Sequence, residues 1–224
     1  MNDLTLIIPA KNEAESLPVV LEELKKYDYK INVILHKSDV ETIQSIKNYN
    51  IEMIYQKNLG YGDALIEGIN RCNTEYFCIF NADGSFDPSE LETMHSTIHN
   101  KNLDFLFASR YQANSGSDDD TIITKIGNFL FTLIGNIFFK LKITDILYTF
   151  TMGRADKARK LNLLQKNFTF CVELPIKAKK NNMKISSISS YERKRIAGLK
   201  KVNAFKDGLL ILMHMIKLFF LKSK

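Results

Sequence analysis

The stretch at residues 76–90 decides the fold of this chain and reads Tyr76-Phe77-Cys78-Ile79-Phe80-Asn81-Ala82-Asp83-Gly84-Ser85-Phe86-Asp87-Pro88-Ser89-Glu90. A short apolar run of strand formers ends at Asn81, and Asp87-Pro88 predicts a helix with proline at its first position. Asn81 and Asp83 alternate with Ala82, so in extended chain both side chains point the same way. A carboxylate beside a neutral oxygen at such a strand end could hold a divalent cation against a diphosphate. An ordinary strand-to-helix turn uses the same residue types, so both interpretations stay open for this segment.

Strand and helix signals alternate in the same way through the first 110 residues. The expected strands are Leu4–Ile8, Ile31–Leu35, Ile51–Tyr55, Tyr76–Phe80 and Leu103–Ala108, and the expected helices are Glu15–Lys26, Asp39–Tyr49, Asp63–Cys72 and Pro88–Asn100. Ser38 and Glu41 predict a capping box for the second helix. Alternation with short loops predicts a mostly parallel, doubly wound α/β sheet, so residues 1–110 are expected to form a nucleotide-binding half.

The pattern changes after Arg110. Gln112–Asp120 is polar and rich in Gly, Ser and Asp, which predicts a mobile connection. The elements expected after it are a long apolar helix Thr121–Leu141, a short strand near Tyr148–Met152, helices Asp156–Leu164 and Val172–Asn181, a late strand Lys184–Glu192, a basic loop Arg193–Asn203 and a terminal helix Phe205–Leu221. We therefore divide the chain into a domain over residues 1–204 and a C-terminal amphipathic helix over residues 205–224.

Composition limits the possible partners and compartment. The 224 residues carry a net charge of +6, and the chain is heavily basic from Lys177 onward, which favours anionic partners such as phosphates, nucleic acid or an acidic membrane surface. Cys72, Cys78 and Cys171 lack metal-type spacing and predict free thiols in a reducing compartment. The first ten residues are typical of a core strand rather than of a secretory signal.

Two apolar stretches, Ile126–Phe139 and Gly208–Leu221, are fourteen residues each. Both are shorter than the roughly 20 residues needed to cross a bilayer, and polar residues interrupt both, so we expect no spanning helix. They are either core helices or helices lying in a membrane interface. The second possibility predicts a protein held peripherally on the cytoplasmic face of a membrane.

Six segments stand out in order along the chain. They are Pro9-Ala10-Lys11-Asn12-Glu13-Ala14-Glu15-Ser16-Leu17, Asn58-Leu59-Gly60-Tyr61-Gly62-Asp63-Ala64-Leu65, Asn81-Ala82-Asp83-Gly84-Ser85-Phe86-Asp87-Pro88, Ala108-Ser109-Arg110-Tyr111, a block beginning at Asp145, and Arg195-Ile196-Ala197-Gly198-Leu199-Lys200-Lys201. Together they resemble the motifs of family 2 glycosyltransferases, and more narrowly the dolichyl-phosphate mannosyltransferase and polyprenyl-phosphate glycosyltransferase branch. The resemblance implies a GT-A-like fold and inverting transfer of a sugar from a nucleotide-diphosphate sugar to a lipid-linked acceptor, polyprenyl phosphate above all.

The resemblance also implies a donor site and a divalent cation, Mg²⁺ or Mn²⁺. The implied donor-binding residues are Pro9, Ala10, Asn12, Glu13, Gly60, Gly62, Asn81, Ala82 and Asp83, and the implied metal ligands are Asn81, Asp83 and Ser85. The cation on Asp83 would stabilise the leaving nucleotide. A charge near a helix N-terminus is the alternative reading of Glu13.

The resemblance also implies basic residues in an acceptor site. They lie in residues 111–204, the expected acceptor half, and at Arg110, where the nucleotide-binding half ends. Arg110, Lys125, Arg195 and Lys201 are expected to contact phosphate, and Asp83, Asp145, Arg110 and Arg195 form the expected catalytic set. We expect Arg110 and Arg195 to converge on one phosphate site beside Asp83. A phosphate monoester has a second pKa of about 6 and needs little general base, which fits the scattered positions of the four histidines. Asp145 could orient the acceptor or a basic residue, or cap a turn.

Three departures from the family pattern leave other functions open. His36-Lys37-Ser38-Asp39 replaces an acidic turn, Asn81 replaces the first acid of the metal motif, and Thr149 replaces a glycine. A catalytically weakened sugar-nucleotide or membrane-binding protein is therefore the alternative. A sugar-nucleotidyltransferase is disfavoured because Lys11-Asn12-Glu13 contains no glycine, and nucleic-acid binding because no aromatic–basic platform is visible.

Overall fold

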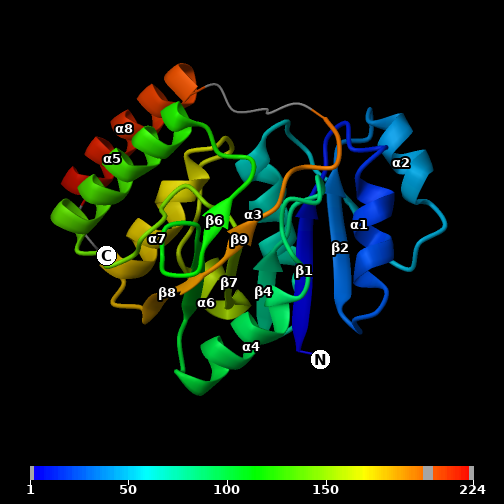
Figure 1. Ribbon diagram of the computed structural model, residues 1–224, viewed down its shortest axis with the longest axis horizontal. Helices are drawn as coiled ribbons and strands as arrows, with labels where there is room; N and C mark the ends of the chain where they lie inside the picture. Colours follow the sequence, from blue (N-terminus) through cyan, green and yellow to red (C-terminus); the bar gives the residue numbers. More distant parts are fainter. Residues whose placement is uncertain (1–2, 199–203, 222–224) are drawn as a thin grey trace.

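The computed structural model describes residues 3–198 and 204–221 (Figure 1). Its strands are β1 (Leu4–Pro9), β2 (Lys30–Leu35), β3 (Glu52–Tyr55), β4 (Tyr76–Ile79), β5 (Phe105–Ser109), β6 (Gly116–Ser117), β7 (Thr151–Arg154), β8 (Ile185–Ser189) and β9 (Tyr191–Glu192). Its helices are α1 (Leu17–Leu24), α2 (Val40–Ile46), α3 (Tyr61–Arg71), α4 (Glu90–Asn100), α5 (Ile122–Phe139), α6 (Ala155–Lys160), α7 (Phe170–Lys180) and α8 (Ala204–Phe220).

Seven strands form the main sheet in the order β3-β2-β1-β4-β7-β5-β8. All neighbours are parallel except β7, which runs antiparallel to both β4 and β5. β6 and β9 form a separate parallel pair. The mostly parallel sheet expected from the sequence is therefore present, with one strand inserted against the general direction.

Helices cover both faces of the sheet, which explains why its strands are apolar on both sides. On β1, Leu6 and Ile8 belong to the core that α1, α2 and α4 close, whereas Ile7 belongs to the core closed by α3, α6 and α7. Gly68 lets α3 lie directly on the sheet, because a Cβ there would be 2.4 Å from the Ile7 side chain.

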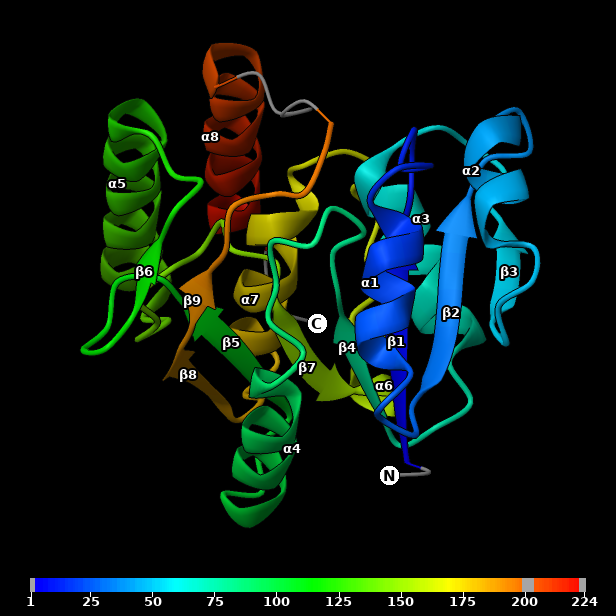
Figure 2. The same cartoon turned by 45° about the vertical axis from the view of Figure 1, so that its right-hand side comes forward.

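The two apolar helices α5 and α8 lie side by side, outside α7 (Figures 1 and 2). α8 contributes Ile211, Met215 and Leu218 to the core, and α5 contributes Phe139. Among the residues described, α5 is long and apolar enough by composition to cross a membrane, and only 22% of it is buried. Both helices therefore present wide apolar faces outward.

Most expected elements are present, with bounds that differ by a few residues, and the starts of α4 and α2 need correction. α4 begins at Glu90 rather than Pro88, because the Asp87 carboxylate accepts a hydrogen bond from the Ser89 amide (2.8 Å) and makes Asp87-Pro88 a preceding turn. Asp39 rather than Ser38 caps α2: its side chain accepts from the Thr42 amide, while the Ser38 hydroxyl pairs with His36.

The expected strand Lys184–Glu192 is two strands, β8 and β9, separated at Ser190. The expected mobile connection before α5 contains β6, and its side chains are bonded to ordered parts of the fold. Asp118 accepts from the Tyr191 hydroxyl, and Ser117 donates to Glu192. This connection is therefore part of the wall beside the sheet.

Candidate active site

The candidate site lies at the carboxyl ends of β1 and β4, two adjacent parallel strands. The chain leaves β1 towards β2 on one side, and β4 lies on the other, so the strand order reverses here. Ligands in open α/β sheets bind at such a switch point. Pro9 ends β1, and Asn81 and Asp83 follow β4, which places both expected donor segments at this point.

The turn after β4 orients one carboxylate. Asp83 Oδ1 accepts hydrogen bonds from the Ser85 amide (3.0 Å) and the Ser85 hydroxyl (2.7 Å), and the Asn81 amide group donates to that hydroxyl (3.2 Å). Gly84 has φ +80°, and a Cβ there would lie 2.4 Å from Ile196. The turn thus requires glycine and leaves Asp83 Oδ2 facing away from Ser85.

A divalent cation fits this turn only with help from a ligand. Within the described residues, no three His, Cys, Asp or Glu side chains gather into a metal-binding group. Mg²⁺ is commonly held by one or two carboxylates together with substrate phosphates and waters, and Asp83 with the Asn81 amide oxygen meets that description. Ser85 is buried, and its hydroxyl donates a hydrogen bond to Asp83. Its geometry is therefore that of a residue that orients the carboxylate.

The segment Arg193–Gly198 crosses directly over this turn. The Arg193 amide donates to the Ser85 carbonyl and the Ile196 amide to the Asp83 carbonyl, both at 2.8 Å. The Arg193 guanidinium donates to the Gly84 and Phe86 carbonyls. We call residues 193–198 the strap, because they hold the Asp83 turn from above.

The strap brings Arg195 to Asp83. Its Nη1 lies 3.6 Å from Asp83 Oδ2, while Nη2 donates to Asp119 Oδ2 at 2.7 Å and Nε to Asp119 Oδ1 at 3.3 Å. The hydrogen bond with Asp119 outweighs burial and raises the pKa of the Arg195 guanidinium, so it stays charged. Sequence reasoning placed Arg195 here but missed Asp119, which lies in the polar segment before α5.

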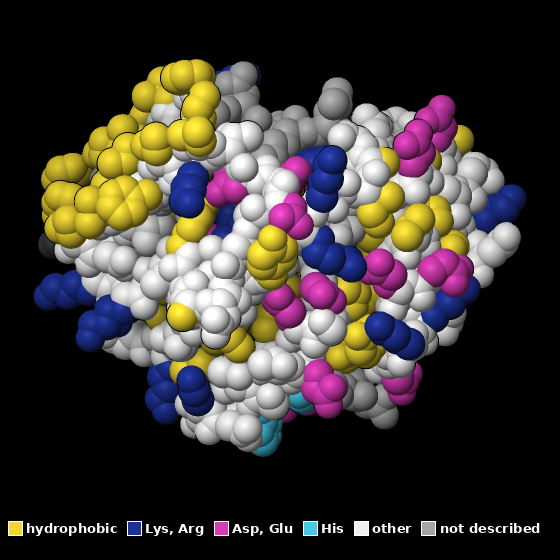
Figure 3. Space-filling model, in the orientation of Figure 1, with side chains coloured by type: hydrophobic (Ala, Val, Ile, Leu, Met, Phe, Trp, Pro, Cys, Tyr) yellow, Lys and Arg dark blue, Asp and Glu magenta, His cyan; other side chains and the backbone are white. Residues whose placement is uncertain are grey.

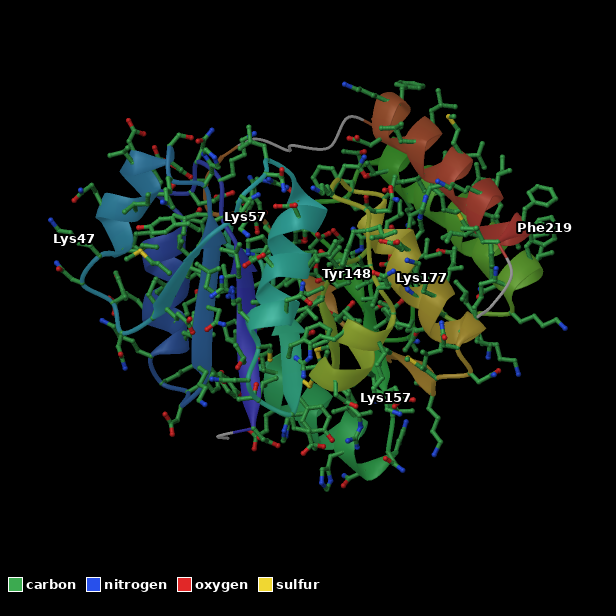
Figure 4. The ribbon with its side chains drawn as sticks, turned by 180° about the vertical axis from the view of Figure 1, so that it is seen from behind. Lys47, Lys57, Tyr148, Lys157, Lys177 and Phe219 are labelled. Atoms are coloured by element: carbon green, nitrogen blue, oxygen red, sulfur yellow. The ribbon has the colours of Figure 1, made fainter. Side chains whose placement is uncertain are left out.

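Arg110 lies at the end of β5 and is bound on two sides by carboxylates. Its Nε and Nη2 donate to Asp145 (2.8 and 3.1 Å), and Nη1 donates to Glu192 (3.1 Å). Its guanidinium stacks 4.6 Å from the centre of the Tyr148 ring, which lies in the interior of the molecule (Figure 4). Burial lowers the pKa of Arg110, but the charge of Asp145, its hydrogen bonds to Arg110 and the charge of Glu192 together outweigh burial, and the pKa is raised well above its usual range.

Asp145 serves as the hub of this buried cluster. It also accepts hydrogen bonds from the Asn128 side chain (2.7 Å) and the Tyr148 amide (3.2 Å). The cluster joins β5, α5 and the loop before β7. Glu192 connects it to the strap, because its charge also acts on Arg195. Arg110 and Arg195 therefore lie in one charged network, although each is paired with different carboxylates.

The loop after β1 is fixed by the start of α2. The Asn12 amide donates to Asp39 (2.7 Å) and the Glu13 amide to the Thr42 hydroxyl (2.9 Å). Glu13 is buried and accepts from the Ser16 hydroxyl (2.6 Å). Asp39 thus lies against the β1 loop, in spite of the altered sequence His36–Asp39.

Gly60 and Gly62 do allow a close approach, but the approaching group is the protein's own chain. A Cβ at Gly60 would lie 2.1 Å from the Lys166 carbonyl, and one at Gly62 would lie 2.1 Å from the Gln165 carbonyl. Glu173 holds this segment by accepting from the amides of Leu164 and Gln165, and it pairs with Lys177 at 2.7 Å. Packing accounts for both glycines, and their part in donor binding stays a prediction.

The family model described as "Glycosyl transferase family 2" matches residues 5–161. The chain belongs to this family. It is therefore an enzyme, and the glycosyltransferase activity expected from the motifs is confirmed.

Sequence relatives of this glycosyltransferase include an uncharacterized protein of Methanocaldococcus jannaschii, 25% identical over 84% of this chain and 80% of that protein. A second is the UDP-N-acetylglucosamine–dolichyl-phosphate N-acetylglucosaminyltransferase of Methanococcus voltae, 26% identical over 82% of each chain. Among solved structures, glucosyl-3-phosphoglycerate synthase of Mycobacterium tuberculosis, crystallised with Mn²⁺, UDP and glucosyl-3-phosphoglycerate, has a TM-score of 0.76 at 10% identity. That alignment covers 97% of this chain and 80% of the synthase, and it confirms the GT-A-like fold.

Of the expected phosphate-binding residues of the glycosyltransferase, Lys125 takes part in none of the contacts described above. Lys125 is exposed on the first turn of α5. Lys201 lies outside the described residues. Thr149, which differs from the family's glycine, accepts or donates a hydrogen bond with the Tyr61 hydroxyl at 2.7 Å. The assignments of individual residues to donor, acceptor and metal stay predictions.

Proposed function

We propose that this chain transfers a sugar from a nucleotide-diphosphate sugar to a lipid phosphate at a membrane surface, with inversion at the anomeric carbon and with a divalent cation on Asp83. The observation that carries the proposal is the apolar surface beside the charged network. Asp119, which pairs with Arg195, lies three residues before the start of α5. A lipid chain lying along α5 could therefore present its phosphate to the Arg195 side of the site.

The outer faces of α5 and α8 together form what we call the apolar face. Figure 3 shows these side chains gathered over the two helices. Its large exposed members are Ile122, Ile123, Ile126, Phe129, Leu130, Leu133, Ile137, Phe138, Phe205, Leu209, Leu210, Leu212, Met213, Ile216, Phe219, Phe220 and Leu221. A contiguous apolar surface of this kind usually marks an interaction site, and helices with one apolar face bind membrane interfaces.

Charge at the site supports a phosphate acceptor. A phosphate monoester is largely ionised at neutral pH, so the chain needs to position it rather than deprotonate it. Two unit charges of the same sign about 4 Å apart repel by about 4 kcal/mol at an effective dielectric of 20, so a cation is needed between donor and acceptor. Arg195 lies beside Asp83 and keeps its charge, which suits it to that position.

The chain's own residues divide the remaining work. Ser85 and Asn81 orient Asp83, and a divalent cation bound there would neutralise the charge that develops on the leaving diphosphate. Arg110 and Asp145 fix the end of β5 against the loop before β7. The name of the M. voltae relative supports a lipid-phosphate acceptor, whereas the M. tuberculosis synthase was crystallised with a soluble phosphate-bearing one.

Membrane binding is tested with phosphatidylglycerol vesicles and a variant of the apolar face. Phe129→Glu combined with Ile216→Glu places charges on α5 and α8 and should keep the protein in the supernatant, whereas wild type should sediment with the vesicles. Val19→Glu is the matched control, because Val19 is also exposed but lies on α1, away from the apolar face. The proposal is wrong if wild type never sediments and transfers sugar to phosphoglycerate rather than to polyprenyl phosphate.

A further inference from the structure

The two oxygens of Asp83 have different surroundings. Oδ1 is satisfied by the amide and hydroxyl of Ser85, at 3.0 and 2.7 Å. Oδ2 faces the Arg195 guanidinium at 3.6 Å, an ion-pair distance that is longer than a hydrogen bond. The oxygen that a divalent cation would take is therefore the one that already faces a positive charge.

Arg195 cannot lose this positive charge by deprotonation. Arginine stays protonated in proteins, and the hydrogen bond with Asp119 raises its pKa further. The side chains of Arg195 and Asp119 are only 20% and 15% exposed, so solvent screens their charges less than it would on an open surface. A divalent cation on Asp83 Oδ2 would lie within a few ångströms of the guanidinium, and the two would repel.

The Arg195 side chain has another anionic partner besides Asp83. The shorter contacts of Arg195 are with Asp119, at 2.7 and 3.3 Å. The charge of Glu192 also stabilises the charged guanidinium. Rotation of the side chain about Asp119 would withdraw Nη1 from Asp83 while keeping the ion pair. The strap backbone need not move, because the Arg193 and Ile196 amides hold it to the Asp83 turn.

We infer that Arg195 is the resident cation of the metal position, that a divalent cation must exchange with it, and that Asp119 is the positioning residue that receives it. This inference rests on the proposed function, in which Asp83 carries the cation. The donor diphosphate is a further anionic partner for Arg195 once the side chain has left Asp83. The protein therefore binds the cation more tightly when the donor is bound, and the donor more tightly when the cation is bound. Asp119 and Arg195 thus couple the two binding events.

The test is Mn²⁺ binding to the full chain without acceptor, measured by isothermal titration and by electron paramagnetic resonance of free Mn²⁺, with and without UDP. Arg195→Gln removes the competing charge and should tighten Mn²⁺ binding without UDP by about 5-fold or more, the lower end of typical couplings between sites. Lys194→Gln is the matched control, because it removes the same charge from an exposed neighbour in the strap. It should leave Mn²⁺ affinity close to that of wild type.

Asp119→Asn tests the same exchange from the other side. It removes the alternative partner of Arg195, so the guanidinium should pair with Asp83 and weaken Mn²⁺ binding several-fold, an effect that lost packing alone would not give. The double variant Asp119→Asn with Arg195→Gln should regain the affinity of Arg195→Gln. Thermal unfolding of each variant establishes that it folds.

Equal Mn²⁺ affinities in Arg195→Gln and Lys194→Gln would overturn the inferred exchange of Arg195 for the divalent cation. If UDP still strengthens Mn²⁺ binding in that case, the proposed function is not contradicted. If neither wild type nor Arg195→Gln binds Mn²⁺, even with UDP, the exchange and the metal-dependent part of the proposed function both fail.

Discussion

Replacing Asp145 by Asn should destabilise the fold, because Asp145 anchors Arg110 and does not itself act on the substrate. The Asp145 side chain is fully buried and accepts five hydrogen bonds, from the Arg110 amide, Nε and Nη2, the Asn128 side chain and the Tyr148 amide. An Asn side chain turns one of the two oxygens into a donor. In either orientation its NH₂ group would face at least two of those donors.

Removing one partner of a buried ion pair destabilises a protein by about 3–5 kcal/mol. Arg110 keeps its contact with Glu192, so we expect the lower end, about 3 kcal/mol. For a chain of this size each kcal/mol lowers Tm by about 2–4 °C, so Asp145→Asn should lower Tm by about 6–12 °C. Circular dichroism during heating measures this shift.

Asp156→Asn is the matched control, because it removes an exposed partner of Lys160 on α6. Such surface pairs contribute about 0–1 kcal/mol, so Tm should change by less than about 4 °C. If Asp145→Asn melts with wild type but loses turnover, Asp145 acts on substrate and its role as anchor of Arg110 is refuted.

Three further predictions concern the packing around the site. Gly62→Ala should destabilise the fold strongly, because its Cβ would lie 2.1 Å from the Gln165 carbonyl, whereas Gly127→Ala, with open space around it, should be neutral or stabilising by up to about 1 kcal/mol in urea unfolding. Glu173→Gln should destabilise by about 1–3 kcal/mol, since the Leu164 and Gln165 amides lose the charged acceptor that the buried Glu173 supplies; an unchanged urea midpoint would contradict this. Burial raises the pKa of the Cys171 thiol to about 12, so at pH 8 it should react with Ellman's reagent roughly a thousand times more slowly in native than in unfolded protein, and a fast native thiol in a Cys72/Cys78 double serine variant would disprove it.

The sequence predicted the Asp83 turn because the side-chain hydrogen bonds within it are local, although the strap that holds it comes from far along the chain. Asn81, Asp83 and Ser85 bond to one another within five residues, and strand-end chemistry is visible in such a short stretch. The apolar helices were predicted for the same reason, since their composition is continuous along the chain. Where two neighbouring residues could serve equally, as Ser38 and Asp39 at the start of α2, a contact with His36 decided between them.

The contacts that join distant segments could not be predicted. Asp119 lies in a polar stretch typical of a solvated loop, and its ion pair with Arg195, 76 residues away, brings it to the site. The glycines at 60 and 62 indicated a close approach but not the approaching group. The antiparallel direction of β7 was also hidden, because residue alternation within a strand is the same in both directions.

The most direct test of the central claim is mass spectrometry of the lipids formed by the purified protein. The protein is incubated with Mn²⁺, a panel of nucleotide-diphosphate sugars and phosphatidylglycerol vesicles that carry polyprenyl phosphate. We predict a polyprenyl phosphate heavier by one sugar residue, formed with one donor, together with stoichiometric nucleoside diphosphate, and no such lipid with Asp83→Ala. Undiminished product from Asp83→Ala, or sugar transfer that bypasses polyprenyl phosphate entirely, would contradict the account.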